Sequence, residues 1–144
     1  MPSLNKFMTI MLVFAIAGII FSGYLSYNIY WGGGCHQTII SCGSNGNVVK
    51  IFGVPTCVYG FFMYLIVATL LTVGLVRPGV LSWLKSAFVI SIVGLLFSLI
   101  LSVYELWFKN SGLNGLPACV YGFFIYLGIF IVGILALKRR NLSQ

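Results

Sequence analysis

The chain has 144 residues, of which 60% are hydrophobic and only 6% are charged. Ordinary soluble domains carry about 25% charged residues, so this composition excludes a water-soluble globule. The net charge is +7, but the basic residues are scattered between apolar segments and form no basic stripe interleaved with aromatic side chains. This pattern argues against nucleic-acid binding. We therefore expect residues 1–144 to form a single domain whose solvent is the lipid membrane.

Four uncharged stretches are long enough to cross a bilayer, which takes about 20 apolar residues. They are Phe7–Trp31, Pro55–Val76, Ser86–Phe108 and Pro117–Leu137. The first stretch is too long for the apolar core of a signal peptide. None of the four alternates between apolar and polar residues as the strands of a membrane barrel do. The sequence therefore predicts an all-α integral membrane protein, a bundle of four transmembrane helices.

The distribution of basic residues predicts how the bundle is oriented. Six of the eight lie before the first helix, between the second and third, or after the fourth: Lys6, Arg77, Lys85, Lys138, Arg139 and Arg140. The positive-inside rule then places both termini in the cytoplasm of a cell whose inner or plasma membrane the chain spans. All four cysteines fall on the exoplasmic side, where disulfides persist. They are Cys35, Cys42, Cys57 and Cys119.

The two halves of the chain resemble each other. Gly18–Trp31 aligns with Gly94–Trp107 at an offset of 76 residues, and Gly53–Leu65 aligns with Gly115–Leu127 at an offset of 62. The chain is therefore predicted to contain two tandem helix–loop–helix repeats related by an axis roughly along the membrane normal. The first exoplasmic loop, residues 32–54, is the longer by 14 residues. We expect it to form a short lid over the mouth of the bundle, with an amphipathic segment at residues 48–52 in the membrane interface.

Cys35 and Cys42 form a Cys-x6-Cys pair within this loop. One interpretation is a structural disulfide that pins the loop. The other is a mobile redox pair that exchanges with the thiols of a partner protein, helped by the flexible Gly32–Gly34 segment. In that case His36 can help to stabilise a thiolate.

Cys57 and Cys119 each follow a proline by two positions at the start of a predicted helix. Proline favours the first helical position, so each sulfur is expected in the first turn. There the free N–H groups and the helix dipole favour a thiolate. The two residues are therefore candidate reactive thiols, the alternative being small apolar fillers of buried helices. If the repeat axis brings the two helix starts together, they can form a disulfide.

These features resemble the vitamin K epoxide reductase family. The resemblance rests on Gly18–Trp31, the loop cysteines followed by Ile51–Pro55, Leu101–Leu106 and the start of the fourth helix. It implies a membrane thiol oxidoreductase that couples disulfide formation in exoplasmic proteins to reduction of a quinone, either ubiquinone or menaquinone. In that family the loop pair takes electrons from a thioredoxin-fold exoplasmic thiol protein. The pair then passes them to a Cys-x-x-Cys motif at the start of the fourth helix.

The fourth helix departs from the family pattern, because Leu116 occupies the position of the first cysteine and only Cys119 remains. Either Cys57 replaces the missing thiol across the repeat interface, or the chain has lost redox catalysis. In the second case it acts as a binding, scaffolding or soft-metal transport protein, since thiolates prefer soft metals. We expect the split pair of Cys57 and Cys119, because a symmetric cysteine at the right helix end would otherwise be a coincidence.

Aromatic residues cluster near the predicted helix ends. Most are expected to anchor the bundle in the membrane interface: Tyr64, Tyr126, Trp31 and Trp107. Tyr59 and Tyr121 lie within a turn of Cys57 and Cys119, and they are candidates for hydrogen bonds to a quinone carbonyl.

Glu105 is the only acidic residue in the chain. An acid within a membrane segment is a functional candidate by default, but near the interface Glu105 can also snorkel or pair with Lys109. No metal site is predicted, because two cysteines and one histidine in the first loop are too few ligands for a convincing one.

Overall fold

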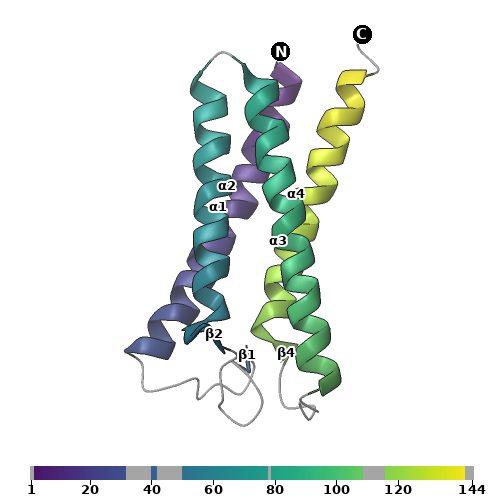
Figure 1. Cartoon of the computed structure of the whole chain (residues 1–144). Coiled ribbons are helices and arrows are strands. Elements are labelled where there is room, and N and C mark those ends of the chain that lie inside the picture. The colour runs from purple at the N-terminus through teal and green to yellow at the C-terminus, as the bar shows by residue number, and fades with distance from the viewer. Residues whose placement is uncertain (1, 32–39, 42–49, 78, 109–115, 142–144) are drawn as a thin grey trace.

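The computed structural model describes residues 2–31, 40–41, 50–77, 79–108 and 116–141. Four long helices dominate it: α1 (Pro2–Tyr30), α2 (Thr56–Val76), α3 (Val80–Phe108) and α4 (Ala118–Asn141). Each contains a span long and apolar enough to cross a membrane. The helices run alternately up and down, so the α2–α3 turn lies at the same end as the start of α1 and the end of α4 (Figure 1). The predicted fold class, a multi-pass membrane bundle of four helices, is confirmed.

Two helices begin earlier than the uncharged stretches indicated. α1 starts at Pro2 and includes Lys6, and α3 starts at Val80 and includes Lys85, whereas Phe7 and Ser86 were the expected starts. Both lysines are exposed. A lysine near a helix end can extend its ammonium group to water, so a charge marks the limit of the hydrocarbon region and not the end of the helix.

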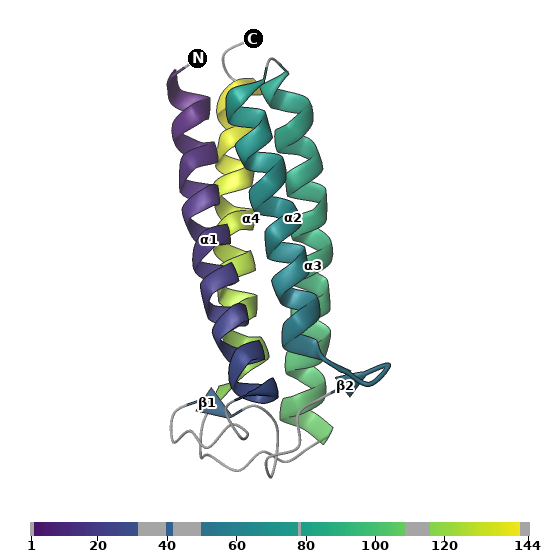
Figure 2. The same cartoon turned by 90° about the vertical axis from the view of Figure 1, so that its left-hand side faces the viewer.

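The helices form a ring in which each packs against its two neighbours. α1 and α3 both pack against α2 and α4. In the side view of Figure 2, α1 lies beside α4 and α2 lies beside α3. The centre of the ring holds Tyr64 and Tyr126, which are only 2% and 1% exposed. The expectation that these tyrosines anchor the bundle in the interface is therefore wrong. In contrast, Trp31 and Trp107 are 76% and 81% exposed, as interface anchors should be.

Two glycines make room for the buried tyrosines. A Cβ atom added at Gly18 would lie 2.6 Å from the Tyr64 ring, and one added at Gly94 would lie 2.5 Å from the Tyr126 ring. Gly18 and Gly94 are equivalent in the two repeats, as are Tyr64 and Tyr126. The internal repeat is therefore present in the packing of the core as well as in the sequence.

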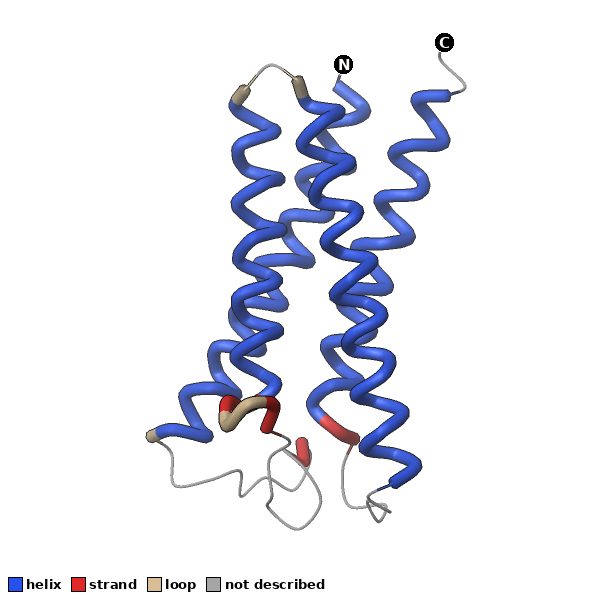
Figure 3. The backbone as a smooth tube through the Cα atoms, viewed as in Figure 1, coloured by secondary structure: helices blue, strands red, loops and turns tan. Residues whose placement is uncertain are grey.

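Short strands lie at the cysteine-containing end of the bundle (Figure 3). β2 (Lys50–Ile51) and β3 (Val54–Pro55) form an antiparallel hairpin. Its turn contains Phe52 and Gly53 with positive φ angles of 52° and 81°, and Phe52 is 98% exposed. Residues 50–52 of the expected amphipathic segment thus belong to a hairpin, and residues 48–49 lie outside the described part.

A second pair of strands joins the first loop to the start of α4. β1 (Ile40–Ser41) pairs in parallel with β4 (Leu116–Pro117), with Ser41 opposite Pro117. Ser41 immediately precedes Cys42 in the sequence, and Pro117 lies two residues before Cys119. The backbone next to one cysteine of the loop pair is therefore held beside the helix start that carries Cys119.

Candidate functional site

A partly open pocket lies between the four helices, with about 480 Å³ of space when the part open to the outside is included. Its wall consists mainly of residues that are equivalent in the two repeats. These pairs are Phe21 and Phe97, Ser22 and Ser98, Leu25 and Leu101, Thr56 and Ala118, Cys57 and Cys119, Gly60 and Gly122, and Tyr64 and Tyr126. Met63 also lines the pocket. The pocket therefore lies on the axis that relates the repeats.

Cys57 and Cys119 both line this pocket as partly buried free thiols. Each is the second residue of its helix, since α2 begins at Thr56 and α4 at Ala118. Their placement in the first helical turn agrees with the sequence analysis. The two equivalent helix starts thus both contribute a thiol to one pocket.

Glu105 lies at the same level of the bundle and is buried, with only 4% of its surface exposed. Its carboxyl group is close enough to interact electrostatically with both thiols. It is also within hydrogen-bonding reach of the Cys119 thiol, as is the Thr56 hydroxyl. Of the alternatives open for Glu105, this burial argues against snorkelling to the interface, and Lys109, the other possible partner, lies outside the described residues.

The position of Glu105 follows from helical periodicity. Ser98, Ser102 and Glu105 are spaced i, i+4 and i+7 along α3, so they share one face, and all three are buried. The equivalent of Glu105 in the first repeat is Ile29, and the equivalent of Thr56 in the second is Ala118. The polar neighbours of Cys119 thus break the symmetry of an otherwise symmetric pocket.

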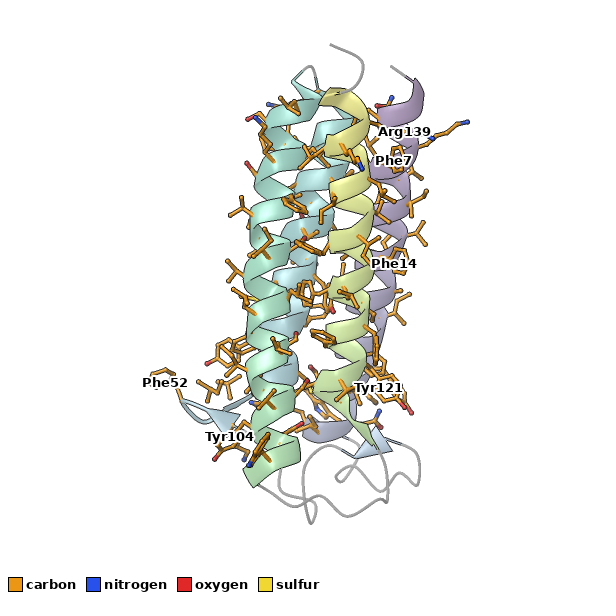
Figure 4. The ribbon with its side chains drawn as sticks, turned by 90° about the vertical axis from the view of Figure 1, so that its right-hand side faces the viewer. Phe7, Phe14, Phe52, Tyr104, Tyr121 and Arg139 are labelled. Carbon is orange, nitrogen blue, oxygen red and sulfur yellow. The ribbon has the colours of Figure 1, made fainter. Side chains whose placement is uncertain are left out.

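Tyr59 and Tyr121, the predicted cofactor-binding residues, are not part of the pocket wall. The Tyr59 hydroxyl donates a hydrogen bond to the Ile51 carbonyl at 3.1 Å, and its ring lies 6.5 Å from that of Phe97. The Tyr121 ring lies 5.6 Å from that of Phe21. Figure 4 shows Tyr121 at the end of the bundle where the β2–β3 hairpin lies. Arg139 lies at the opposite end, with its guanidinium 5.5 Å from the centre of the Phe7 ring. Both tyrosines therefore pack against phenylalanines of the wall.

Tyr64 and Tyr126 line the pocket instead. Each follows a cysteine by seven residues, which is two helical turns, so tyrosine and cysteine share a face. Tyr59 and Tyr121 follow the cysteines by two residues and therefore point away from that face. This spacing is the sequence signal that distinguishes the two sets of tyrosines.

The two pocket tyrosines stack, with ring centroids 4.2 Å apart and an interplanar angle of 12°. The Tyr64 hydroxyl donates a hydrogen bond of 2.8 Å to the Gly122 carbonyl. The buried Tyr126 hydroxyl has no hydrogen-bond partner among the residues that the structure describes. An unsatisfied buried hydroxyl is costly, so a site that keeps one is suited to a ligand that supplies the missing acceptor.

This difference predicts unequal effects of two matched substitutions on the stability of the protein. Tyr64→Phe removes the bond to Gly122 and should lower the free energy of unfolding by about 0.5–1.5 kcal/mol. Tyr126→Phe removes a hydroxyl that has no such bond and should not destabilise the ligand-free protein. Unfolding of both variants in detergent micelles checks this, and equal losses in the two would contradict it.

The loop residues Cys35, His36 and Cys42 lie outside the described part of the structure, so their predicted roles remain predictions. Among the described residues, no group of three or more metal-ligating side chains is close enough to hold a metal ion.

Comparison with known proteins identifies the family. Residues 9–113 match the model of the vitamin K epoxide reductase family, which is well over half of the chain. No curated protein and no solved structure matches the chain. The matched region includes most of α1, all of α2 and α3, and three of the four cysteines, and it ends before Cys119.

Proposed function

Because the chain belongs to the vitamin K epoxide reductase family, we propose that it oxidises the thiols of exoplasmic proteins and reduces a quinone. Family membership supports a membrane thiol oxidoreductase in general. The observation that carries the finer proposal is that Cys57 and Cys119, from equivalent helix starts, line one pocket on the repeat axis. A dithiol can deliver two electrons only if two sulfurs can close a disulfide, and this pocket holds two.

In this proposal Cys57 replaces the cysteine that the family carries at the position of Leu116. Cys119 alone would stop at a mixed disulfide, because no second thiol could displace its partner. Oxidation of the split pair forms one S–S bond between Cys57 and Cys119 and releases two protons and two electrons. These electrons and protons are what a quinone needs.

The residues of the pocket fit a quinone. The wall is mostly apolar, and the unsatisfied Tyr126 hydroxyl can donate a hydrogen bond to a carbonyl oxygen. When bound, a quinone accepts the two electrons and two protons and becomes the quinol. Tyr59 and Tyr121 then position Phe97 and Phe21 of the wall and do not contact the ring directly.

Cys35 and Cys42 complete the cycle as the shuttle between the pocket and a thioredoxin-fold partner. As a dithiol the loop pair attacks the Cys57–Cys119 disulfide, forms a mixed disulfide and leaves as the Cys35–Cys42 disulfide. That disulfide then oxidises the partner's two thiols. The pairing of β1 with β4 supports this route, because it holds the backbone next to Cys42 beside the start of α4. We place these cysteines on the exoplasmic side and both termini in the cytoplasm.

Tyr126→Phe should weaken quinone binding by about tenfold, which is what one lost hydrogen bond of about 1.4 kcal/mol costs. Quenching of aromatic fluorescence by a short-chain quinone, titrated into the purified protein, measures the dissociation constant. Tyr121→Phe is the matched control and should bind as the unmodified protein does. Equal affinity in all three proteins would contradict the assignment of Tyr126.

The proposed function is tested by adding a short-chain ubiquinone or menaquinone analogue to the fully reduced protein without oxygen. Absorbance should show formation of quinol in proportion to the protein present, while an added thioredoxin-fold dithiol protein should sustain turnover. If the reduced protein leaves both quinones unchanged, the redox proposal fails and a binding or soft-metal transport role becomes the better account of the fold.

A further inference from the structure

The thiol chemistry of the pocket requires a proton acceptor, and one carboxyl group lies beside it. Glu105 is the only acidic residue in the chain and is 4% exposed. It lies one helical turn beyond Leu101 and two beyond Ser98, both of which line the pocket, and the Cys119 thiol is within its hydrogen-bonding reach. A carboxylate so deep in an apolar bundle is costly unless its surroundings use it.

We propose that Glu105 is a catalytic residue that accepts the proton of the Cys119 thiol as that sulfur reacts. Its role in turnover rests on the proposed function, but the proton transfer itself requires only that Cys119 act as a nucleophile. In this step the S–H bond of Cys119 breaks and an O–H bond forms on Glu105. Cys119 then forms its bond to Cys57, and the oxidant takes up two electrons together with the proton from each sulfur.

The advantage of this arrangement is that it creates no new charge in the apolar pocket. With Glu105 ionised, the pair formed by its carboxylate and the thiol carries one negative charge before the transfer. The pair carries the same charge afterwards, on sulfur. Without a carboxylate, deprotonation would have to produce an isolated thiolate among apolar side chains and send the proton to distant water, which is far more costly.

Among the described residues, the titratable groups that interact with Glu105 include the thiols of Cys57 and Cys119. α3 packs against α2 and α4, which present Cys57 and Cys119, and the more distant Tyr64 and Tyr126 of the same pocket. Among the described residues of these elements, no lysine or arginine is buried. Thr56, whose hydroxyl also reaches Cys119, offers a second hydrogen bond to the sulfur without being an acid or a base of suitable strength.

The symmetry of the repeats supports a specific role for Glu105. The pocket wall consists mostly of equivalent pairs, whereas Glu105, which lies beside the wall, has Ile29 as its equivalent. A purely structural polar residue would have no reason to appear at only one of two similar thiols. Cys119 is therefore the sulfur that is deprotonated, and Cys57 is its partner in the disulfide.

The test uses the full chain in micelles without quinone and measures how fast diamide, a general thiol oxidant, closes the Cys57–Cys119 disulfide. Cys35 and Cys42 are replaced by serine throughout so that only the pocket thiols react. Glu105→Gln should slow closure by about 100-fold. In Glu105→Gln the rate of disulfide closure should rise about tenfold per pH unit, because hydroxide then replaces the lost carboxylate as the base. Glu105→Asp keeps the carboxylate, so its disulfide should close at least about tenfold faster than that of Glu105→Gln.

Ile29→Gln is the matched control, because it introduces the same amide at the equivalent depth of the first repeat and leaves Glu105 in place. It should close its disulfide at the normal rate. A rate for Glu105→Gln within about twofold of normal, or equal slowing in Glu105→Asp, would overturn the proposal.

A second measurement avoids substitution of Glu105 altogether. Because Glu105 is the only acidic side chain, a chain labelled with ¹³C-glutamate gives one side-chain carboxyl signal in infrared difference spectra between the dithiol and disulfide states. We expect that signal to shift on oxidation, and an unchanged carboxyl region would overturn the proposal. Neither the diamide rate nor the infrared signal involves quinone. If these two measurements contradict the role of Glu105, quinone reduction by the protein is unaffected. If they support that role but the protein reduces no quinone, only the proposed function is refuted.

Discussion

Replacement of either Cys57 or Cys119 by serine is expected to reduce quinone reduction to the rate seen without protein. The expected loss exceeds about 1,000-fold, because a dithiol reaction cannot be completed by one sulfur and the two residues act as a unit. The rate of quinol formation in anaerobic micelles, with a thioredoxin-fold dithiol as electron donor, measures this. The informative result is an equal loss of activity in the two variants. The family motif alone would predict a loss for Cys119→Ser and none for Cys57→Ser.

The matched control is the chain in which Cys35 and Cys42 are both serine. It should still reduce about one equivalent of quinone from its own pocket thiols, but it should not turn over with the partner protein. If Cys57→Ser retains turnover, the split pair is wrong and another group must take the place of the missing cysteine.

Gly18→Ala and Gly94→Ala are expected to destabilise the bundle by about 1–3 kcal/mol each, the usual cost of forcing extra volume into a packed core. The added methyl groups would lie 2.6 Å and 2.5 Å from the rings of Tyr64 and Tyr126. Neither ring can easily move away, because the two are stacked on each other and Tyr64 is also bonded to Gly122. Gly18→Ala should be the more harmful, since displacement of Tyr64 also breaks that hydrogen bond.

Gly60→Ala provides the control for these two variants. Gly60 is a helical glycine of the same pocket, but a Cβ atom there meets nothing within 4 Å. It should cost nothing and can gain up to about 1 kcal/mol from helix propensity. The free energy of unfolding in mixed micelles checks all three, and a loss at Gly60 as large as that at Gly18 would contradict the proposed cause.

The sequence was sufficient to predict the helices and the repeat, because both depend on long and recurrent patterns. Bilayer-length apolar runs do not depend on tertiary contacts, and the offsets of 76 and 62 residues pair equivalent positions without a structure. From this pairing it follows that Cys57 and Cys119 are symmetric. The orientation of side chains was harder to predict, since lipid and core are both apolar and hydrophobicity does not distinguish a face toward lipid from a face toward the bundle.

The same difficulty explains the expectation for Tyr64 and Tyr126 that was wrong and the ambiguity over Glu105. Tyr64 and Tyr126 resemble interface anchors by their distance from the helix ends, but their seven-residue spacing from Cys57 and Cys119 places them on the same helix face as the cysteines. For Glu105 the interface was one open alternative, although its spacing from Ser98 and Ser102 places it on the buried face of α3. In both cases the spacing relative to another pocket residue carried the information, and proximity to the helix end did not.

The central claim is that Cys57 and Cys119 form the redox pair of this protein. The most direct measurement is a thiol count on the reduced chain with Cys35 and Cys42 replaced by serine, using a mass-tagged maleimide before and after addition of quinone. The account predicts that two reactive thiols before quinone become none, with a Cys57–Cys119 linked peptide in the digest. If both thiols remain available to the maleimide after quinone, the two cysteines are not a redox pair.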